Sequence, residues 1–222
     1  MSILSLTTRS TQIFALALFA LLFQSHGSLS FAGTVKLVVL GDSLSAGYRL
    51  PQGSGFPEQL QSRLNKDGIK VKVINAGVSG DTTAGGLARL SWSVPKGTHA
   101  VIVELGANDA LRGVNPQQTY KNLDKLIGKL RKRGIKVLLA GMEAPRNLGA
   151  PYVKAFGAIY PDLAKKYSVA LYPFFLKDVA LQKRLLLSDG LHPNEKGVAV
   201  MVKNIKPYVE RLVRQAGRTA TH

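Results

Sequence analysis

A serine, a histidine and an aspartate stand at positions where they could act together in acyl transfer, as nucleophile, base and orienting acid. Ser43 directly follows the apolar run 35–40 and Gly41-Asp42, and His192 comes three residues after Asp189. This spacing lets the Asp189 carboxylate accept the Nδ1 proton of His192 across a tight turn, which leaves Nε2 for the serine. Taken singly, Ser43 also fits a helix cap, and Asp189 with His192 also fits a hydrogen-bonded turn.

The other histidines are poorly placed to serve as the base. His26 lies in an apolar N-terminal segment, His99 precedes a predicted strand at the opposite edge of the sheet, and His222 is the last residue. His192 is therefore the histidine that we expect to face Ser43.

Acyl transfer also needs hydrogen-bond donors for the oxyanion. The candidates are the backbone N–H groups of Ser43 and Gly80 and the side-chain amide of Asn108. A turn glycine and a turn asparagine are the simpler interpretations of Gly80 and Asn108 in isolation, but each follows a predicted strand, as Ser43 does. Asp42 is better interpreted as an organiser of its loop, because Asp189 has the spacing to serve His192.

The elements that must position these residues alternate between strand and helix. The predicted strands are Val35–Leu40, Val71–Ile74, Ala100–Leu105, Lys136–Ala140 and Val169–Tyr172. The predicted helices are Phe56–Lys66, a short one around Leu87–Trp92, one capped by Asn115 and closed by Gly134, Pro151–Tyr167, and one after Asn194 that Pro207 should kink or end. This alternation predicts an α/β fold, a three-layer sandwich with a five-stranded parallel sheet. The loops that carry Ser43, Gly80, Asn108 and His192 can then converge on one edge of that sheet.

The first 32 residues resemble a secretory signal. Arg9 precedes the apolar segment Ile13–Phe23, and Ser30-Phe31-Ala32 offers a small-x-small cleavage site. The 11 apolar residues fall short of the roughly 20 that span a bilayer. We therefore expect export to the periplasm or the exterior of a bacterial cell, one domain over 33–216, and a frayed tail over 217–222.

The predicted mature chain carries 29 basic and 13 acidic residues, a net charge of +16. The basic residues are spread over several helices without interleaved aromatic residues, which argues against specific nucleic-acid binding and allows weak attraction to anionic membrane surfaces. The absence of cysteine excludes disulfides and thiolate metal sites. We expect a monomer.

Four segments resemble, in order and spacing, the sequence blocks of the GDSL or SGNH hydrolases. They are Gly41-Asp42-Ser43-Leu44-Ser45, Gly80 within Ser79-Gly80-Asp81-Thr82, Gly106-Ala107-Asn108-Asp109, and Asp189-Gly190-Leu191-His192-Pro193-Asn194. Three further segments resemble the secreted bacterial group of arylesterases, acyl-CoA thioesterases and lysophospholipases. They are Leu44-Ser45-Ala46-Gly47-Tyr48, Gly86-Leu87-Ala88-Arg89-Leu90 and Val103-Glu104-Leu105-Gly106.

The resemblance implies a flavodoxin-like sheet with Ser43 on a short helical turn after the first strand. It implies Ser43 as nucleophile, Asp189 and His192 as its partners, Ser43, Gly80 and Asn108 as oxyanion donors, and neither metal nor organic cofactor. By the same analogy, loops 109–114 and 142–150 would border the acyl site. Glu143 and Arg146 place charges near the second of these loops.

The predicted function is hydrolysis of small-molecule carboxylic esters, and of acyl thioesters or lysophospholipids, through an acyl-enzyme on Ser43. Two alternatives remain open at this point. One is a carbohydrate O-deacetylase, because the same blocks serve removal of acetyl groups from glycans. The other is an exported, non-catalytic protein that binds lipid or an acidic polymer.

Overall fold

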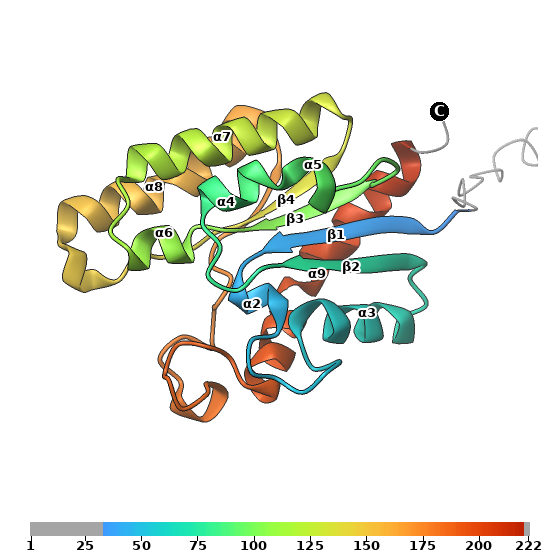
Figure 1. Cartoon of the computed structure of the whole chain (residues 1–222). Helices are drawn as coiled ribbons and strands as arrows, with labels where there is room; N and C mark the ends of the chain where they lie inside the picture. The colour runs from blue at the N-terminus through green and yellow to red at the C-terminus, as the bar shows by residue number, and fades with distance from the viewer. Residues whose placement is uncertain (1–32, 220–222) are drawn as a thin grey trace, which may run out of the picture. The chain divides into compact units, whose positions relative to one another are not determined.

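The computed structural model describes residues 33–219, and the predicted signal lies outside that range. Five parallel strands form one sheet in the order β2-β1-β3-β4-β5 (Figure 1). The strands are β1 (Val35–Gly41), β2 (Val71–Gly77), β3 (Ala100–Glu104), β4 (Lys136–Ala140) and β5 (Ala170–Tyr172). This is the flavodoxin-like order, in which the chain reverses direction across the sheet between β1 and β3. The predicted α/β fold is confirmed.

Helices cover both faces of the sheet. They are α2 (Ser43–Ala46), α3 (Phe56–Lys66), α4 (Thr83–Ala88), α5 (Leu90–Ser93), α6 (Ala107–Leu111), α7 (Pro116–Lys132), α8 (Ala150–Tyr167) and α9 (Glu195–Thr219), with short 3₁₀ turns η1 (Arg146–Leu148) and η2 (Lys183–Leu185). Helices α3 and α9 pack on one face, and α4, α7 and α8 on the other (Figure 1). The result is the predicted three-layer arrangement.

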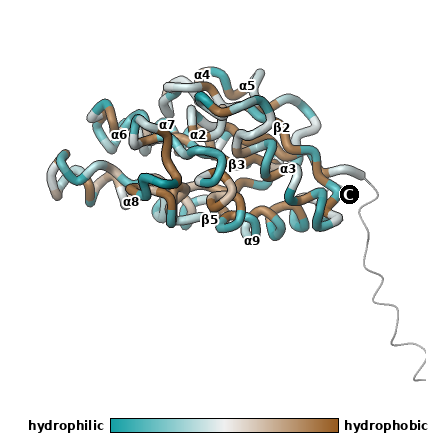
Figure 2. The backbone as a smooth tube through the Cα atoms, turned by 90° about the horizontal axis from the view of Figure 1, so that it is seen from below, coloured by the Kyte–Doolittle hydropathy of each residue, from teal (hydrophilic) through white to brown (hydrophobic). Residues whose placement is uncertain are grey.

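The central strands are apolar because both of their faces are covered. Every residue of β3 is buried, and β1 is buried at all positions except Lys36. The long helices instead alternate between hydrophobic (brown) and hydrophilic (teal) residues along their length (Figure 2), as expected for helices with one face on the core. The carboxyl ends of β1 and β3 therefore lie against a buried core.

Several element boundaries differ from those predicted. Strand β2 extends through Asn75-Ala76-Gly77, and the single short helix expected around residues 87–92 is two helices that meet at Arg89. Helix α6 was not predicted. Helix α9 continues through Pro207 to Thr219, past the predicted start of a frayed tail at Gly217. Its buried apolar face, which includes Ile205 and Val209, holds the helix together where proline removes one backbone donor.

Within residues 33–219, no helix combines the length and the apolar character that crossing a bilayer requires.

Candidate active site

Ser43 begins helix α2 at the point where β1 ends. The helix is a single short turn, and its N-cap is Asp42, whose Oδ1 accepts a hydrogen bond from the Leu44 backbone N–H at 3.0 Å. Asp42 thus organises this loop, as predicted. The strand needs glycine at its last position, because a Cβ on Gly41 would overlap Glu104 Oε2 and Ser45 Oγ. The turn is therefore held tightly against the end of the sheet.

The structure brings Ser43, His192 and Asp189 into one continuous line of hydrogen bonds. Ser43 Oγ lies 2.9 Å from His192 Nε2, and His192 Nδ1 lies 2.8 Å from Asp189 Oδ2. The His192 and Asp189 side chains are 22% and 24% exposed, so the line reaches the protein surface where a substrate can meet it. These distances are those of a nucleophile, a base and the group that orients the base.

Asp189 is held as a carboxylate by its own loop. Its Oδ1 accepts the backbone N–H groups of His192 at 3.0 Å and Leu191 at 2.9 Å. These donors, together with the imidazole, lower the pKa of Asp189 to about 2. The negative charge beside His192 Nδ1 is therefore present throughout mildly acidic and neutral pH, where it favours the tautomer with its proton on Nδ1.

An aromatic ring supports the imidazole from another side. The Tyr48 and His192 ring centroids are 4.5 Å apart, and the Arg49 guanidinium carbon lies 5.1 Å from the Tyr48 centroid. Tyr48 follows α2, so the segment that carries Ser43 also supplies a contact to its partner. Sequence reasoning missed this contact, because nothing in the spacing of Tyr48 and His192 indicates that their rings meet.

Gly80 lies in the loop between β2 and α4, with a φ of +79° that favours glycine. Its carbonyl accepts a hydrogen bond from Arg112 Nη2 at 2.8 Å. This bond connects the loop to the residue that ends α6, the helix that carries Asn108.

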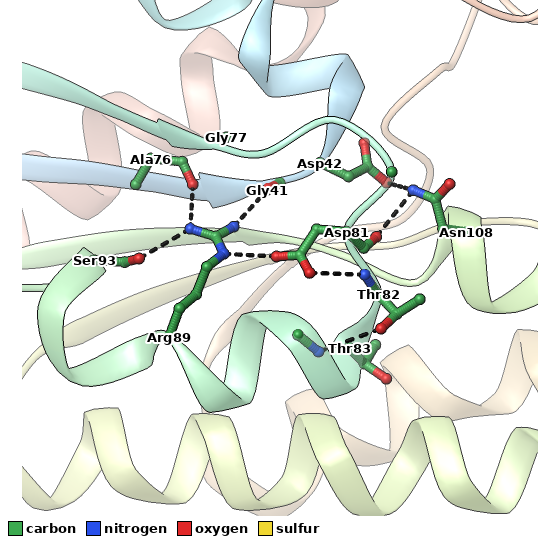
Figure 3. A network of polar contacts seen from close by, with 12 residues as sticks. Gly41, Asp42, Ala76, Gly77, Asp81, Thr82, Thr83, Arg89, Ser93 and Asn108 are labelled. Atoms are coloured by element: carbon green, nitrogen blue, oxygen red, sulfur yellow. Dashed lines mark hydrogen bonds and ion pairs between the residues drawn. The ribbon is translucent and has the colours of Figure 1, made fainter.

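Asn108 joins the Ser43 and Gly80 segments. Its Nδ2 donates to Asp42 Oδ2 and to the Asp81 carbonyl, both at 2.9 Å (Figure 3). Asp42 is the residue before Ser43, and Asp81 is the residue after Gly80. The segments that carry the three predicted oxyanion donors are therefore joined by the hydrogen bonds of Asn108, and an oxyanion would share the Asn108 amide with these acceptors.

A pair of buried carboxyl groups, Asp42 and Glu104, lies next to the Ser43 turn. Glu104 Oε2 accepts the Asp42 backbone N–H at 3.2 Å and the Ser45 hydroxyl at 2.6 Å, and Glu104 Oε1 has no protein partner. Burial raises the pKa of Asp42 to about 6. Burial, reinforced by the neighbouring Asp42 charge, raises the pKa of Glu104 well above its ordinary value. In the sequence, Glu104 is only one residue of the Val103-Glu104-Leu105-Gly106 segment, and no pattern indicates that its carboxyl lies here.

Of the three other histidines, the structure describes His99, and it also describes both flanking loops. His99 lies at the amino end of β3, where its Nδ1 accepts the Lys36 backbone N–H at 2.9 Å, and His26 and His222 are outside the described residues. The loop predicted over 109–114 was wrong for 109–111, which belong to α6, where the buried Asp109 carboxylate accepts hydrogen bonds from Thr83. That this segment borders the acyl site stays a prediction.

In the second flanking loop, Glu143 and Arg146 are both exposed. The described residues hold no group of three histidine, aspartate or glutamate side chains arranged to bind a metal ion.

A parallel α/β sheet with serine, histidine and aspartate joined at its carboxyl edge defines the class of α/β serine hydrolases. The sequence profile of the GDSL-like lipase/acylhydrolase family matches residues 39–200, and the chain belongs to that family. The predicted family, and with it an enzyme that hydrolyses esters, is confirmed.

Related proteins agree with this assignment. The chain is 40% identical over 183 residues to Esterase TesA of Pseudomonas aeruginosa, covering 82% of this chain and 91% of that protein. It is also 40% identical over 183 residues to thioesterase 1/protease 1/lysophospholipase L1 of Escherichia coli K12, covering 80% and 86%. The solved structure of the psychrotrophic esterase EstA from Pseudoalteromonas sp., inhibited by monoethylphosphonate, has a TM-score of 0.76 at 31% identity and covers 79% of this chain and 97% of its own.

Proposed function

We propose that the protein hydrolyses acyl esters and thioesters through an acyl-enzyme on Ser43, with His192 as base and then acid and Asp189 as its orienting group. The single observation that carries the proposal is the unbroken hydrogen-bonded line from Ser43 Oγ through His192 to Asp189. The lowered pKa of Asp189 supports it, because a charged carboxylate beside Nδ1 also stabilises the imidazolium that forms during the reaction.

In the first step Ser43 Oγ forms a bond to the acyl carbon while its proton passes to His192 Nε2. The tetrahedral intermediate collapses with cleavage of the bond to the leaving oxygen or sulfur, which receives that proton. Water then attacks the acyl-enzyme, gives a proton to Nε2, and releases the carboxylic acid as Ser43 regains its hydrogen. The first step therefore needs His192 with Nε2 free to accept a proton.

The oxyanion is proposed to be bound by the N–H groups of Ser43 and Gly80 and by the Asn108 amide. Within the described residues, neither of these two backbone N–H groups donates a hydrogen bond to the protein. Both belong to segments that Asn108 connects through Asp42 and Asp81. Donors that are fixed before the substrate arrives stabilise the developing charge without reorganisation.

The acyl group is proposed to be a fatty-acyl chain. Five large apolar side chains are exposed among residues 33–219, and three of them are near the predicted site residues in sequence: Val78 (43%), Leu111 (55%) and Leu191 (54%). Each lies within three residues of Gly80, Asn108 or His192. Apolar surface next to the reacting groups favours an apolar acyl chain over acetyl. The names of the relatives, thioesterase and lysophospholipase, point to acyl thioesters and lysophospholipids as substrates.

We also propose that the protein works outside the cytoplasm as a monomer, with weak attraction to anionic membrane surfaces. The signal-like residues 1–32 and the net charge of +16 over the rest of the chain support this. Intact mass of the exported protein should show the loss of about 32 residues. Light scattering should give the mass of one chain.

Covalent labelling tests the nucleophile. A fluorophosphonate probe should add one adduct to the wild-type protein, and peptide mass spectrometry should place it on Ser43. Ser43→Ala should lose both the adduct and turnover. Ser62→Ala, which removes an exposed serine from α3, should keep both. An S43A protein that is folded and still hydrolyses a chromogenic acyl ester would exclude this mechanism, and an unlabelled wild-type protein would favour the non-catalytic binding protein.

A panel of acyl chain lengths tests the substrate class. Esters and thioesters from acetyl to palmitoyl, with acetylated glycan as a further arm, should give the highest kcat/KM at medium or long chains. Preference for the glycan would instead indicate the O-deacetylase.

A further inference from the structure

Arg89, between α4 and α5, is a buried arginine, and two of its acceptors, Gly41 and Asp81, belong to the segments that carry Ser43 and Gly80. Its side chain is 8% exposed. Nε donates to Asp81 Oδ2 at 2.6 Å, Nη2 to the Gly41 carbonyl at 2.8 Å, and Nη1 to the Ala76 carbonyl at 2.7 Å and to Ser93 Oγ at 2.9 Å (Figure 3). One guanidinium thus connects the carboxyl ends of β1 and β2 to the loop that follows β2.

These acceptors stand directly beside the proposed oxyanion donors. Gly41 is two residues before Ser43, and Asp81 is joined by a peptide bond to Gly80. The Asp81 carbonyl accepts the Asn108 amide, so the third donor is reached through one further hydrogen bond. Asp81 Oδ1 also accepts the Thr82 N–H at 3.0 Å, which fixes the carboxylate that Arg89 binds.

We propose that Arg89 is a positioning residue that sets the geometry of the oxyanion hole by holding Gly41 and Asp81 at a fixed separation. The inference rests on the proposed function, because it takes Ser43, Gly80 and Asn108 as the oxyanion donors. Arginine suits this position since its planar fork offers five donors in fixed directions, whereas lysine offers a single, flexible ammonium group. No short sequence pattern links the three segments that Arg89 connects.

The decisive experiment is a double-mutant cycle with Arg89→Lys and Asn108→Ala. Loss of an oxyanion donor lowers kcat by about 10²- to 10³-fold, so N108A should fall in this range. R89K should lower kcat by about 10- to 100-fold with little change in KM, because a displaced donor affects the transition state more than substrate binding. In the N108A background, R89K should cost at least about fivefold less than in the wild type, because the two residues act on a shared group.

Two further variants keep the result interpretable. Arg133→Lys is the matched control, because Arg133 Nη2 also donates to carbonyls, those of Val94 and Pro95, away from the site. R133K should leave kcat unchanged. Asp81→Asn is the second probe, because it removes the charge opposite Arg89 and should lower kcat without raising KM. Thermal unfolding of each protein shows whether it is folded at the assay temperature.

Specific outcomes overturn the inference. If R89K and D81N lower only the melting temperature, or neither folds at any assay temperature, Arg89 serves the fold alone. If R89K lowers kcat by the same factor in the wild type and in N108A, Arg89 does not act through Asn108. Failure of the proposed function has a different signature, since it would appear as activity in Ser43→Ala. Loss of activity in S43A and N108A with R89K unaffected would reject only the role of Arg89.

Discussion

Two aspartates flank the reacting groups, and the protein shifts their pKa values in opposite directions. Asp42 precedes Ser43 in the chain and is fully buried, and its pKa is raised to about 6. Asp189 is 147 positions further along the chain and partly exposed, and its pKa is lowered to about 2. The residue that is adjacent to the serine in sequence is therefore the poorer candidate for a permanent charge.

The difference arises from how each carboxylate is solvated. The Asp189 carboxylate accepts hydrogen bonds from two backbone N–H groups and the imidazole, which take the place of water. Asp42 also accepts hydrogen bonds, from Leu44 and Asn108, but complete burial outweighs them. Asp189 stays charged and can therefore hold the histidine tautomer. Asp42, with a pKa near 6, can instead make its hydrogen bond to Asn108 sensitive to acid.

Asp189→Asn should cause the largest effect on activity in this comparison. The asparagine oxygen can still accept the backbone N–H groups, but an amide beside Nδ1 removes the charge and favours the wrong imidazole tautomer. We expect kcat to fall by roughly 10³- to 10⁴-fold, with the fold intact. Steady-state kinetics and circular dichroism would measure the two effects, and a folded D189N enzyme with kcat within tenfold of the wild type would remove Asp189 from the triad.

Asp42→Asn should cause an intermediate effect. Asparagine can still cap α2, but its amide would face the Asn108 amide, so the bond that places Asn108 is lost. We expect kcat to fall by about 10- to 100-fold. In the wild type, Asp42 is protonated as the pH falls through about 6, which weakens the same bond and contributes to the acidic loss of activity.

The pH profile of kcat/KM for D42N should therefore have a shallower acidic limb than that of the wild type. Asp162→Asn, an exposed change on α8, is the control and should keep the wild-type profile. Identical acidic limbs in D42N and the wild type would show that Asp42 does not titrate in the working enzyme.

Glu104→Gln should cause the smallest change in activity. Because the pKa of Glu104 is raised in the folded protein, this carboxyl stays protonated there at pH values where the unfolded chain has already ionised it, so stability falls as the pH rises from the unfolded pKa toward the folded one. Glutamine keeps an oxygen that can accept the Asp42 N–H and Ser45 hydroxyl, so we expect kcat at neutral pH to stay within about threefold.

The stability of the wild type should decline as the pH rises toward the raised pKa of Glu104, and E104Q should lack that part of the decline. Denaturant unfolding from pH 5 to 9 would measure this, again with Asp162→Asn as control. Parallel stability curves for E104Q and the wild type would mean that Glu104 has the same pKa in the folded and unfolded protein, so that folding does not raise it.

Much of the fold was predictable because it depends on local patterns. The apolar runs of β1 and β3 and the buried stripe of α9 follow directly from residue order, and Asn194 caps α9 as predicted through a bond from the Gly197 N–H. The errors fall where local pattern is weak. The helix expected around residues 87–92 is divided at Arg89, whose side chain is committed to acceptors in other segments.

For the candidate site, the residues were predictable but their supporting contacts were not. The identities of Ser43, Gly80, Asn108, Asp189 and His192 followed from residue types at strand ends, and their roles stay predictions until tested. Tyr48, Glu104 and Arg89 were not identified, because each has a contact to a residue far away in the sequence: His192 for Tyr48, Ser45 for Glu104 and the Gly41 carbonyl for Arg89. Every residue has a backbone carbonyl, so the sequence does not show which of them accepts a side-chain hydrogen bond.

The sequence by itself determined the class of fold and the family, because strand and helix periodicity and the four sequence blocks are local properties, and from those blocks it predicts the reacting residues. Only the tertiary structure decided which aspartate keeps its charge, and which buried groups hold the oxyanion donors in place. The physical reason is that burial and hydrogen bonding between distant segments set pKa values and distances, and both arise only when β1, β2 and β3 end side by side.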